Sequence, residues 1–110
     1  MSEMKELLGA LGLCARAGKL ICGIPMICDA LKQGGKGAPQ LVLEAGDTSA
    51  NSHKRIGDRC RYYNTKLIRL PLSGGELGAC VGKTTSLGAV AVTDAGMAAM
   101  VEAKCNKQTD

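Results

Sequence analysis

The chain has 110 residues and a formal net charge of +4, with two tyrosines and no phenylalanine or tryptophan. This length supports one domain with its own core and excludes two domains of ordinary size. No apolar stretch approaches the roughly 20 residues that span a bilayer, and the charged, amphipathic N-terminus is unlike a signal peptide. We therefore expect a cytoplasmic protein with an aliphatic core and no membrane partner.

The first part of the chain predicts two helices. The first begins after Ser2 and ends with Gly18 in a left-handed conformation. Its apolar positions have the spacing of an amphipathic helix: Met4, Leu7, Leu8, Leu11 and Cys14/Ala15. After an extended segment at residues 19–22, Pro25 marks a second helix, since proline is tolerated in a first helical turn. The apolar stripe of this second helix is Ile24, Ile27, Cys28 and Leu31.

The middle of the chain predicts a strand, a helix and a strand. Residues 41–45 and 66–70 are the two apolar segments, and the helix between them, at residues 51–63, is strongly basic. This succession is one α/β unit, which sets the fold class.

The last part continues the alternation. Ser73 and Glu76 have the spacing of a capping box, and the short helix that they begin stops at Gly82. Residues 88–93 then read as a buried strand, and Asp94 caps a final helix.

Together these segments predict an α/β fold, a three-layer αβα sandwich around a central sheet of about four strands. We expect one domain at residues 1–105 and a frayed C-terminal tail at residues 106–110.

The spacing of the cysteines and of the single histidine gives little support to a metal site or a disulfide. The cysteines fall in or beside apolar stretches, at positions 14, 22, 28, 60, 80 and 105, and no two of them form a C-x-x-C pair. We interpret them as small buried hydrophobes in a reducing compartment, with a disulfide or metal role as the alternative. His53, the single histidine, lies near an apolar helix face and is interpreted as structural, because no acidic or thiol partner is visible near it.

Enzymatic chemistry is also not predicted. Residues 78–84 approach a phosphate-binding loop, but three residues separate the two glycines where the motif needs four. Glu44 and Asp47 lie near a strand end and could face a cleft, but capping of the next helix explains Asp47. We assign no catalytic residue, metal or cofactor and expect a binding module.

Positive charge is concentrated in the middle of the chain. Residues 16–83 carry eleven basic and five acidic side chains, whereas the two ends carry three basic and five acidic ones. This distribution fits a polyanion such as RNA, and an ordinary solvated surface is the alternative.

Four segments, at residues 8–20, 41–51, 60–64 and 76–83, resemble a known family. It is the ribosomal-protein family that binds kinked RNA, with the large-subunit proteins of the seven-Ae and thirty-e types, and the chain is most similar to its small bacterial YlxQ-like branch. The resemblance covers residues 7–100. It implies an αβα sandwich and a non-enzymatic, ribosome-associated role with structured RNA as partner, together with ribosomal or translation-related proteins.

The resemblance also implies where RNA would bind. In the family, RNA meets the helix start after the first strand and the loop before the last strand, here residues 23–32 and 83–87. The candidate RNA-binding residues are Arg16, Lys19, Gly23, Pro25, Met26, Asp29, Lys32, Lys36, Lys83, Thr84, Thr85, Ser86 and Leu87.

Three of these positions depart from the family pattern. Kink-binding members carry Gly-x-Asn-Glu-x-x-Lys, and this chain has Pro25, Met26 and Asp29 in place of Asn, Glu and Lys. We therefore expect mainly electrostatic RNA binding and weak recognition of kink-turns. The alternative is a protein-interaction module that kept the fold and lost RNA, which the apolar run of residues 24–26 favours.

Overall fold

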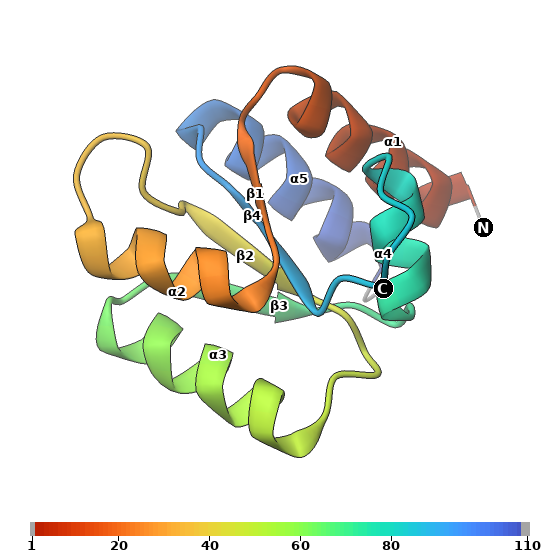
Figure 1. The fold of residues 1–110 in the computed structure, drawn as a ribbon. Helices are drawn as coiled ribbons and strands as arrows, with labels where there is room; N and C mark the ends of the chain where they lie inside the picture. Colours follow the sequence, from red (N-terminus) through yellow and green to blue (C-terminus); the bar gives the residue numbers. More distant parts are fainter. Residues whose placement is uncertain (1, 109–110) are drawn as a thin grey trace.

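The expected helices and strands occur in the expected order in a computed structural model that describes residues 2–108 (Figure 1). Their bounds are α1 Ser2–Arg16, β1 Leu20–Cys22, α2 Ile24–Gln33, β2 Leu41–Glu44, α3 Ala50–Tyr62, β3 Lys66–Arg69, α4 Gly74–Cys80, β4 Ala89–Val92 and α5 Ala95–Gln108. The helix α5 continues past the expected domain end at residue 105, and residues 109–110 of the expected tail lie outside the described residues.

The four strands of the described chain form one mixed sheet in the order β1-β4-β2-β3. Strand β2 pairs in parallel with β3, and β4 pairs antiparallel with both β1 and β2. All residues of the two central strands are buried, which explains why β2 and β4 are almost continuously apolar in sequence.

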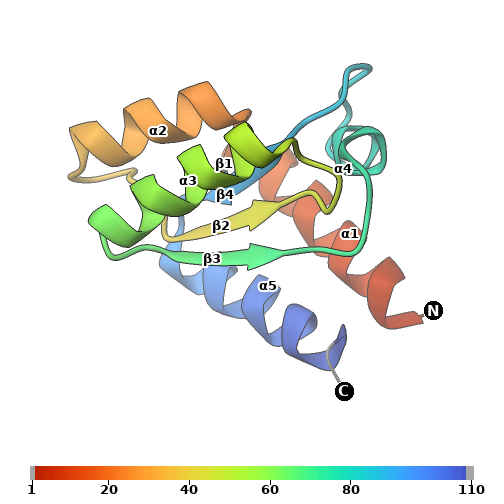
Figure 2. The same cartoon turned by 90° about the horizontal axis from the view of Figure 1, so that it is seen from below.

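Helices cover both faces of the sheet, which confirms the three-layer αβα sandwich. Figure 2 shows α2 and α3 on one side of the sheet and α1 and α5 on the other. Because successive strand residues point to opposite faces, Leu41, Leu43 and Val90 join the core beneath α1, α4 and α5, whereas Val42 and Ala91 join the core beneath α2 and α3.

The helix ends follow the expected capping chemistry. Gly18 has a φ of 72°, the left-handed conformation expected after α1. The Ser73 hydroxyl accepts from the Glu76 N–H, and the Glu76 carboxylate accepts from the Ser73 N–H, so the capping box is present. Asp94 Oδ2 accepts a 2.9 Å hydrogen bond from the Met97 N–H and caps α5.

Most of the cysteines are buried, as expected, and only Cys22 and Cys80 are partly exposed. Burial, reinforced by neighbouring negative charge, raises the pKa of Cys60 and of Cys105 to about 11. Within residues 2–108, no three potential metal ligands lie together and no helix is long and apolar enough to cross a bilayer.

Candidate functional site

The N-terminus of α2 presents free backbone donors. Gly23 precedes the helix with a φ of 94°, a conformation that residues with a side chain rarely adopt. Its N–H donates to the Ala89 carbonyl at 2.9 Å, which attaches the helix start to the beginning of β4. No side chain caps α2, Pro25 has no N–H, and the N–H groups of Ile24 and Met26 have no acceptor among the described residues. The helix start can therefore accept an anion or a hydrogen-bond acceptor.

The loop before β4 lies against this helix start. A Cβ atom placed on Gly88 would come within 2.8 Å of the Ile24 side chain, so the two segments are in contact. Lys83 lies close enough to Cys22 for its positive charge to lower the pKa of that thiol, although burial raises the pKa more strongly. The loop carries the exposed polar side chains of Lys83, Thr84, Thr85 and Ser86, and Leu87 packs inward on the core.

Close packing on α4 fixes the shape of this loop. The Leu87 N–H donates to the Gly74 carbonyl at 2.9 Å. A Cβ atom on Gly78 would overlap the Thr85 carbonyl oxygen, so the loop backbone occupies the space that a side chain would need. Glycine at position 78 is thus a requirement of the loop.

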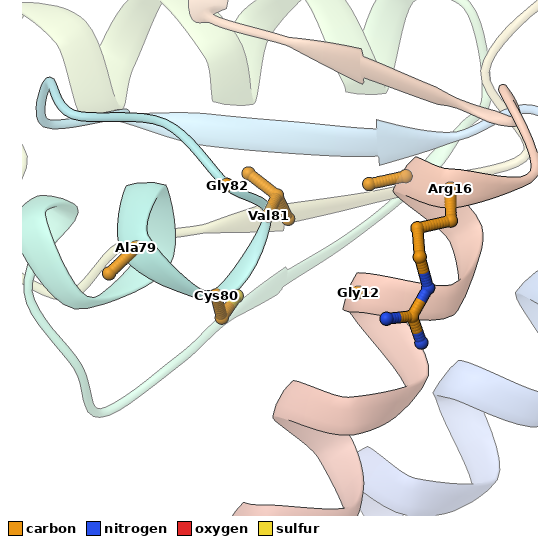
Figure 3. Close-up of a pocket in the computed structure, with 7 residues that line it drawn as sticks. Gly12, Arg16, Ala79, Cys80, Val81 and Gly82 are labelled. Carbon is orange, nitrogen blue, oxygen red and sulfur yellow. The ribbon is translucent and has the colours of Figure 1, made fainter.

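Arg16 lies beside the turn at residues 79–82 that leads into this loop. It lines a pocket of about 410 Å³ between the end of α1 and the turn after α4, together with Gly12, Ala15 and residues 79–82. Figure 3 shows Arg16 across this pocket from Val81 and Gly82, and Lys83 follows directly in sequence. Hereafter the helix-start surface means Gly23, Pro25, Met26 and residues 83–87, and Arg16 lies beyond Lys83, across the pocket from residues 81–82.

The other candidate residues lie farther away. Lys32 is in the last turn of α2 and Lys36 follows it, at the opposite end of the ten-residue helix from Gly23 (Figure 1), about 15 Å away at 1.5 Å per residue. The Lys19 carbonyl accepts from the Thr93 N–H, which places Lys19 at the opposite end of β4 from the Gly23 contact. Asp29 is exposed on α2 itself. The helix-start surface therefore gathers only part of the predicted set.

A buried carboxylate beside this surface was not expected from the sequence. Glu44, at the end of β2, is fully buried. Its carboxylate accepts a hydrogen bond from the Thr48 hydroxyl and lies 2.8 Å from Nδ1 of His53 and 4.0 Å from Nε of Arg69. Arg69 also donates to the Gly46 carbonyl at 3.1 Å. The interpretation that His53 has no acidic partner is wrong, because Glu44 reaches it across the turn at residues 45–49.

The turn at residues 45–49 is anchored to the loop before β4 and to α4. The Ala45 N–H donates to the Gly88 carbonyl at 2.8 Å. Asp47 Oδ1 accepts from the Gly74 N–H at 2.8 Å, so this aspartate caps α4, and the expectation that it caps the next helix is wrong. Ser49 caps α3 instead, through the Ser52 N–H.

Comparisons with known proteins identify the family of this chain. Residues 5–102 match the family described as Ribosomal protein L7Ae/L30e/S12e/Gadd45. The RNA-binding protein YlxQ of Bacillus subtilis (strain 168) is 35% identical over 88 residues, which are 80% of this chain and 83% of that protein.

Two solved structures are similar in fold. A protein with unknown function from Bacillus halodurans C superposes with a TM-score of 0.81 at 27% identity, over 91% of this chain and 96% of the other. The Giardia lamblia 15.5kD RNA binding protein has a TM-score of 0.70 at 18% identity, over 97% of this chain and 88% of the other, a likeness that shows the fold alone. The resemblance seen in the sequence, including that to the YlxQ-like branch, is confirmed, and the chain belongs to the ribosomal protein L7Ae/L30e/S12e/Gadd45 family.

Proposed function

We propose that this chain is a non-enzymatic RNA-binding protein of the cytoplasm that holds structured RNA, in particular ribosomal RNA, on the helix-start surface. The observation that carries the proposal is the uncapped N-terminus of α2, whose free N–H groups lie beside a polar loop. The name of YlxQ, an RNA-binding protein that is 35% identical to this chain, supports it.

The chemistry of the surface suits a phosphate backbone. The free N–H groups of Ile24 and Met26 and the positive end of the α2 dipole favour an anion. Lys83 adds a cation to this surface and Arg16 adds another beyond it, and neither side chain makes an ion pair among the described residues. The hydroxyls of residues 84–86 can donate hydrogen bonds to phosphate, and they can donate to or accept from a ribose 2′-OH.

The same surface offers little for reading bases. Pro25 has no donor, the Met26 side chain is apolar and 60% exposed, and Asp29 is a carboxylate on the same helix. Sequence-specific contacts to base edges need polar side chains, and Asp29 repels phosphates. We therefore propose electrostatic binding with weak preference for kink-turns.

A salt titration tests the proposal. A fluorescein-labelled, blunt-ended kink-turn RNA is titrated with the protein between 50 and 200 mM KCl. The affinity is expected to fall steeply with salt: the slope of the logarithm of the association constant against the logarithm of the salt concentration should be about −1 for each phosphate neutralised. Lys83→Gln is expected to weaken binding and to reduce the slope by about one. Lys5→Gln, an equal change of charge on α1, serves as the control. Absence of binding at 50 mM salt would refute the proposal.

The alternative of a protein-interaction module has one observation in its favour, the exposed Met26 next to Pro25. The apolar run of residues 24–26 is smaller than the sequence suggested, because Ile24 is only 7% exposed and packs beneath the helix. If RNA binding fails while the chain co-sediments with ribosomal or translation-related proteins after nuclease treatment, this alternative takes its place.

A further inference from the structure

Both aromatic residues of the chain lie together at the end of α3. Tyr62 is 80% exposed, and its ring centroid lies 4.9 Å from that of Tyr63 in an edge-to-face arrangement. The two rings line a surface pocket of about 460 Å³ with Asp58 and Arg59. A protein with no other aromatic side chain thus holds one ring almost wholly in solvent at the edge of a pocket.

Unpaired positive charge lies along the same helix. Arg55, Arg59 and Tyr62 follow one another at intervals of four and three residues, so they share one side of α3. Both arginines are exposed, and neither side chain makes a hydrogen bond or ion pair with a described residue. Hereafter the α3 outer face means these three residues with Asp58 and Tyr63.

The other charged side chains of α3 pair with one another, two cations sharing one carboxylate. Lys54 donates to Asp58 at 2.9 Å, and Arg61 donates to the same carboxylate. The Lys54 hydrogen bond is the main cause that lowers the pKa of Asp58, which therefore remains a carboxylate at neutral pH. The pocket accordingly has a negative group on one wall and a guanidinium on another.

The position of α3 extends the positive surface. Figures 1 and 2 show α2 and α3 side by side on one face of the sheet, running in the same direction. Lys32 and Lys36, which lie away from the helix-start surface, are therefore at the same end of this layer as Tyr62. The exposed Arg55 and Arg59 lie on α3 between its first turn and Tyr62.

We propose that the α3 outer face is a second contact for single-stranded RNA, with an unpaired base against the Tyr62 ring and its phosphates on Arg55 and Arg59. This proposal extends the proposed function, since it takes RNA as the ligand. Unpaired bases expose the faces that stack on aromatic rings, whereas duplex bases do not. The Asp58 carboxylate can accept a hydrogen bond from a base amino group, which a phosphate cannot donate, so it favours the base as the occupant of the pocket.

The test uses fluorescein-labelled decacytidylate RNA, whose bases carry amino donors, and measures affinity by anisotropy at 50 mM KCl. Tyr62→Ala is expected to weaken binding about tenfold or more through the loss of stacking. Tyr62→Phe keeps the ring and is expected to stay within about twofold of wild type. Because Tyr62 is 80% exposed, the alanine variant should keep the wild-type melting temperature.

Two variants that each remove one positive charge show whether the position of the charge matters. Arg59→Gln and Lys5→Gln remove one charge each, on α3 and on α1, and only the first is expected to weaken decacytidylate binding by more than about threefold. Intrinsic tyrosine fluorescence gives an independent readout, because both tyrosines of the chain lie on this face. Decacytidylate is expected to quench it in the wild-type protein.

The two proposed RNA surfaces can be tested independently of each other. Tyr62→Ala should leave binding of the blunt-ended kink-turn RNA unchanged, and Lys83→Gln should weaken that binding while preserving tyrosine quenching by decacytidylate. Equal decacytidylate affinity of wild type, Tyr62→Ala and Arg59→Gln would overturn the second contact while leaving the first in place. Loss of affinity in Arg59→Gln but not in Tyr62→Ala would also overturn it. That result would mean that the face binds any polyanion, such as an acidic protein segment, through charge alone and without stacking on the ring.

Discussion

His53 Nδ1 lies 2.8 Å from Oε2 of Glu44, and the glutamate is fully buried while the histidine side chain is 48% exposed. The pair therefore joins the end of β2 to the first turns of α3 through a charge that has no contact with solvent. A buried carboxylate needs its hydrogen-bond partners, because removal of one partner leaves part of its desolvation uncompensated.

His53→Ala is expected to lower the free energy of unfolding by about 1–3 kcal/mol, since Glu44 then keeps only Thr48 and the more distant Arg69. Urea denaturation measures the change. Lys54→Ala, at the next position, removes only a solvent-exposed ion pair with Asp58 and is expected to stay within about 0.5 kcal/mol of wild type. Equal stability of the two variants would mean that water replaces the histidine without cost.

Gly78→Ala is expected to destabilise the protein by about 1–3 kcal/mol and to weaken RNA binding, because the new methyl group would overlap the Thr85 carbonyl oxygen. Gly9→Ala is the matched control, since nothing lies within 4 Å of the Cβ position at Gly9 in α1. Alanine there should raise stability by roughly 0.5–1 kcal/mol through helix propensity. Wild-type RNA affinity of Gly78→Ala would show that the position of the loop does not matter for binding.

The triple variant Pro25→Asn, Met26→Glu, Asp29→Lys is expected to bind a kink-turn RNA at least about a hundredfold more tightly than the wild-type chain. Each restored contact to a base edge contributes ~1–3 kcal/mol, and the lysine replaces a repulsive carboxylate. Anisotropy titration of both proteins gives the ratio, and Asp29→Lys alone separates the effect of charge from that of base contacts. If the wild-type chain already binds as tightly as the triple variant, the α2 backbone is sufficient for recognition.

Stability is expected to fall at alkaline pH because of the two buried thiols. Burial raises the pKa of Cys60 and Cys105 to about 11, from an ordinary value near 9. The unfolded chain therefore loses these protons first, so the favourable contribution is complete below pH 9 and is lost as pH rises toward 11. Cys60→Ala, compared with wild type by urea denaturation from pH 8.5 to 10.5, should lose less stability over this interval. Parallel pH profiles would contradict the assignment to Cys60.

Local signals in the sequence were sufficient to predict the helices and strands of this fold. The stripe of α2 was predictable because its apolar residues recur at helical spacing, and all four of them are buried. The capping box at Ser73 was predictable because both partners lie within one helical turn. Such signals work because each depends on residues that are neighbours in the chain.

The site depended on contacts that no local pattern contains. Glu44 and His53 lie nine positions apart across a turn, so neither periodicity nor spacing predicts their hydrogen bond. Lys32 and Lys36 follow Gly23 closely in sequence, yet a straight helix carries them to the far end of its layer. Ile24 runs directly into the exposed Pro25 and Met26 in sequence, yet it contacts the segment around Gly88 and is buried. In each case the three-dimensional course of a helix or turn determined which residues came together.

The segment at residues 87–89 also bears on how this chain tolerates changes in length. Its three consecutive residues bond to three different segments: Leu87 to Gly74, Gly88 to Ala45 and Ala89 to Gly23. A single inserted residue here would shift the register of all three attachments together. An insertion in the glycine-rich connection at residues 34–37, where the Cβ positions of its glycines are open, would disturb none of them. Loop-length variation among functional relatives should therefore concentrate at residues 34–37 and be absent from residues 87–89.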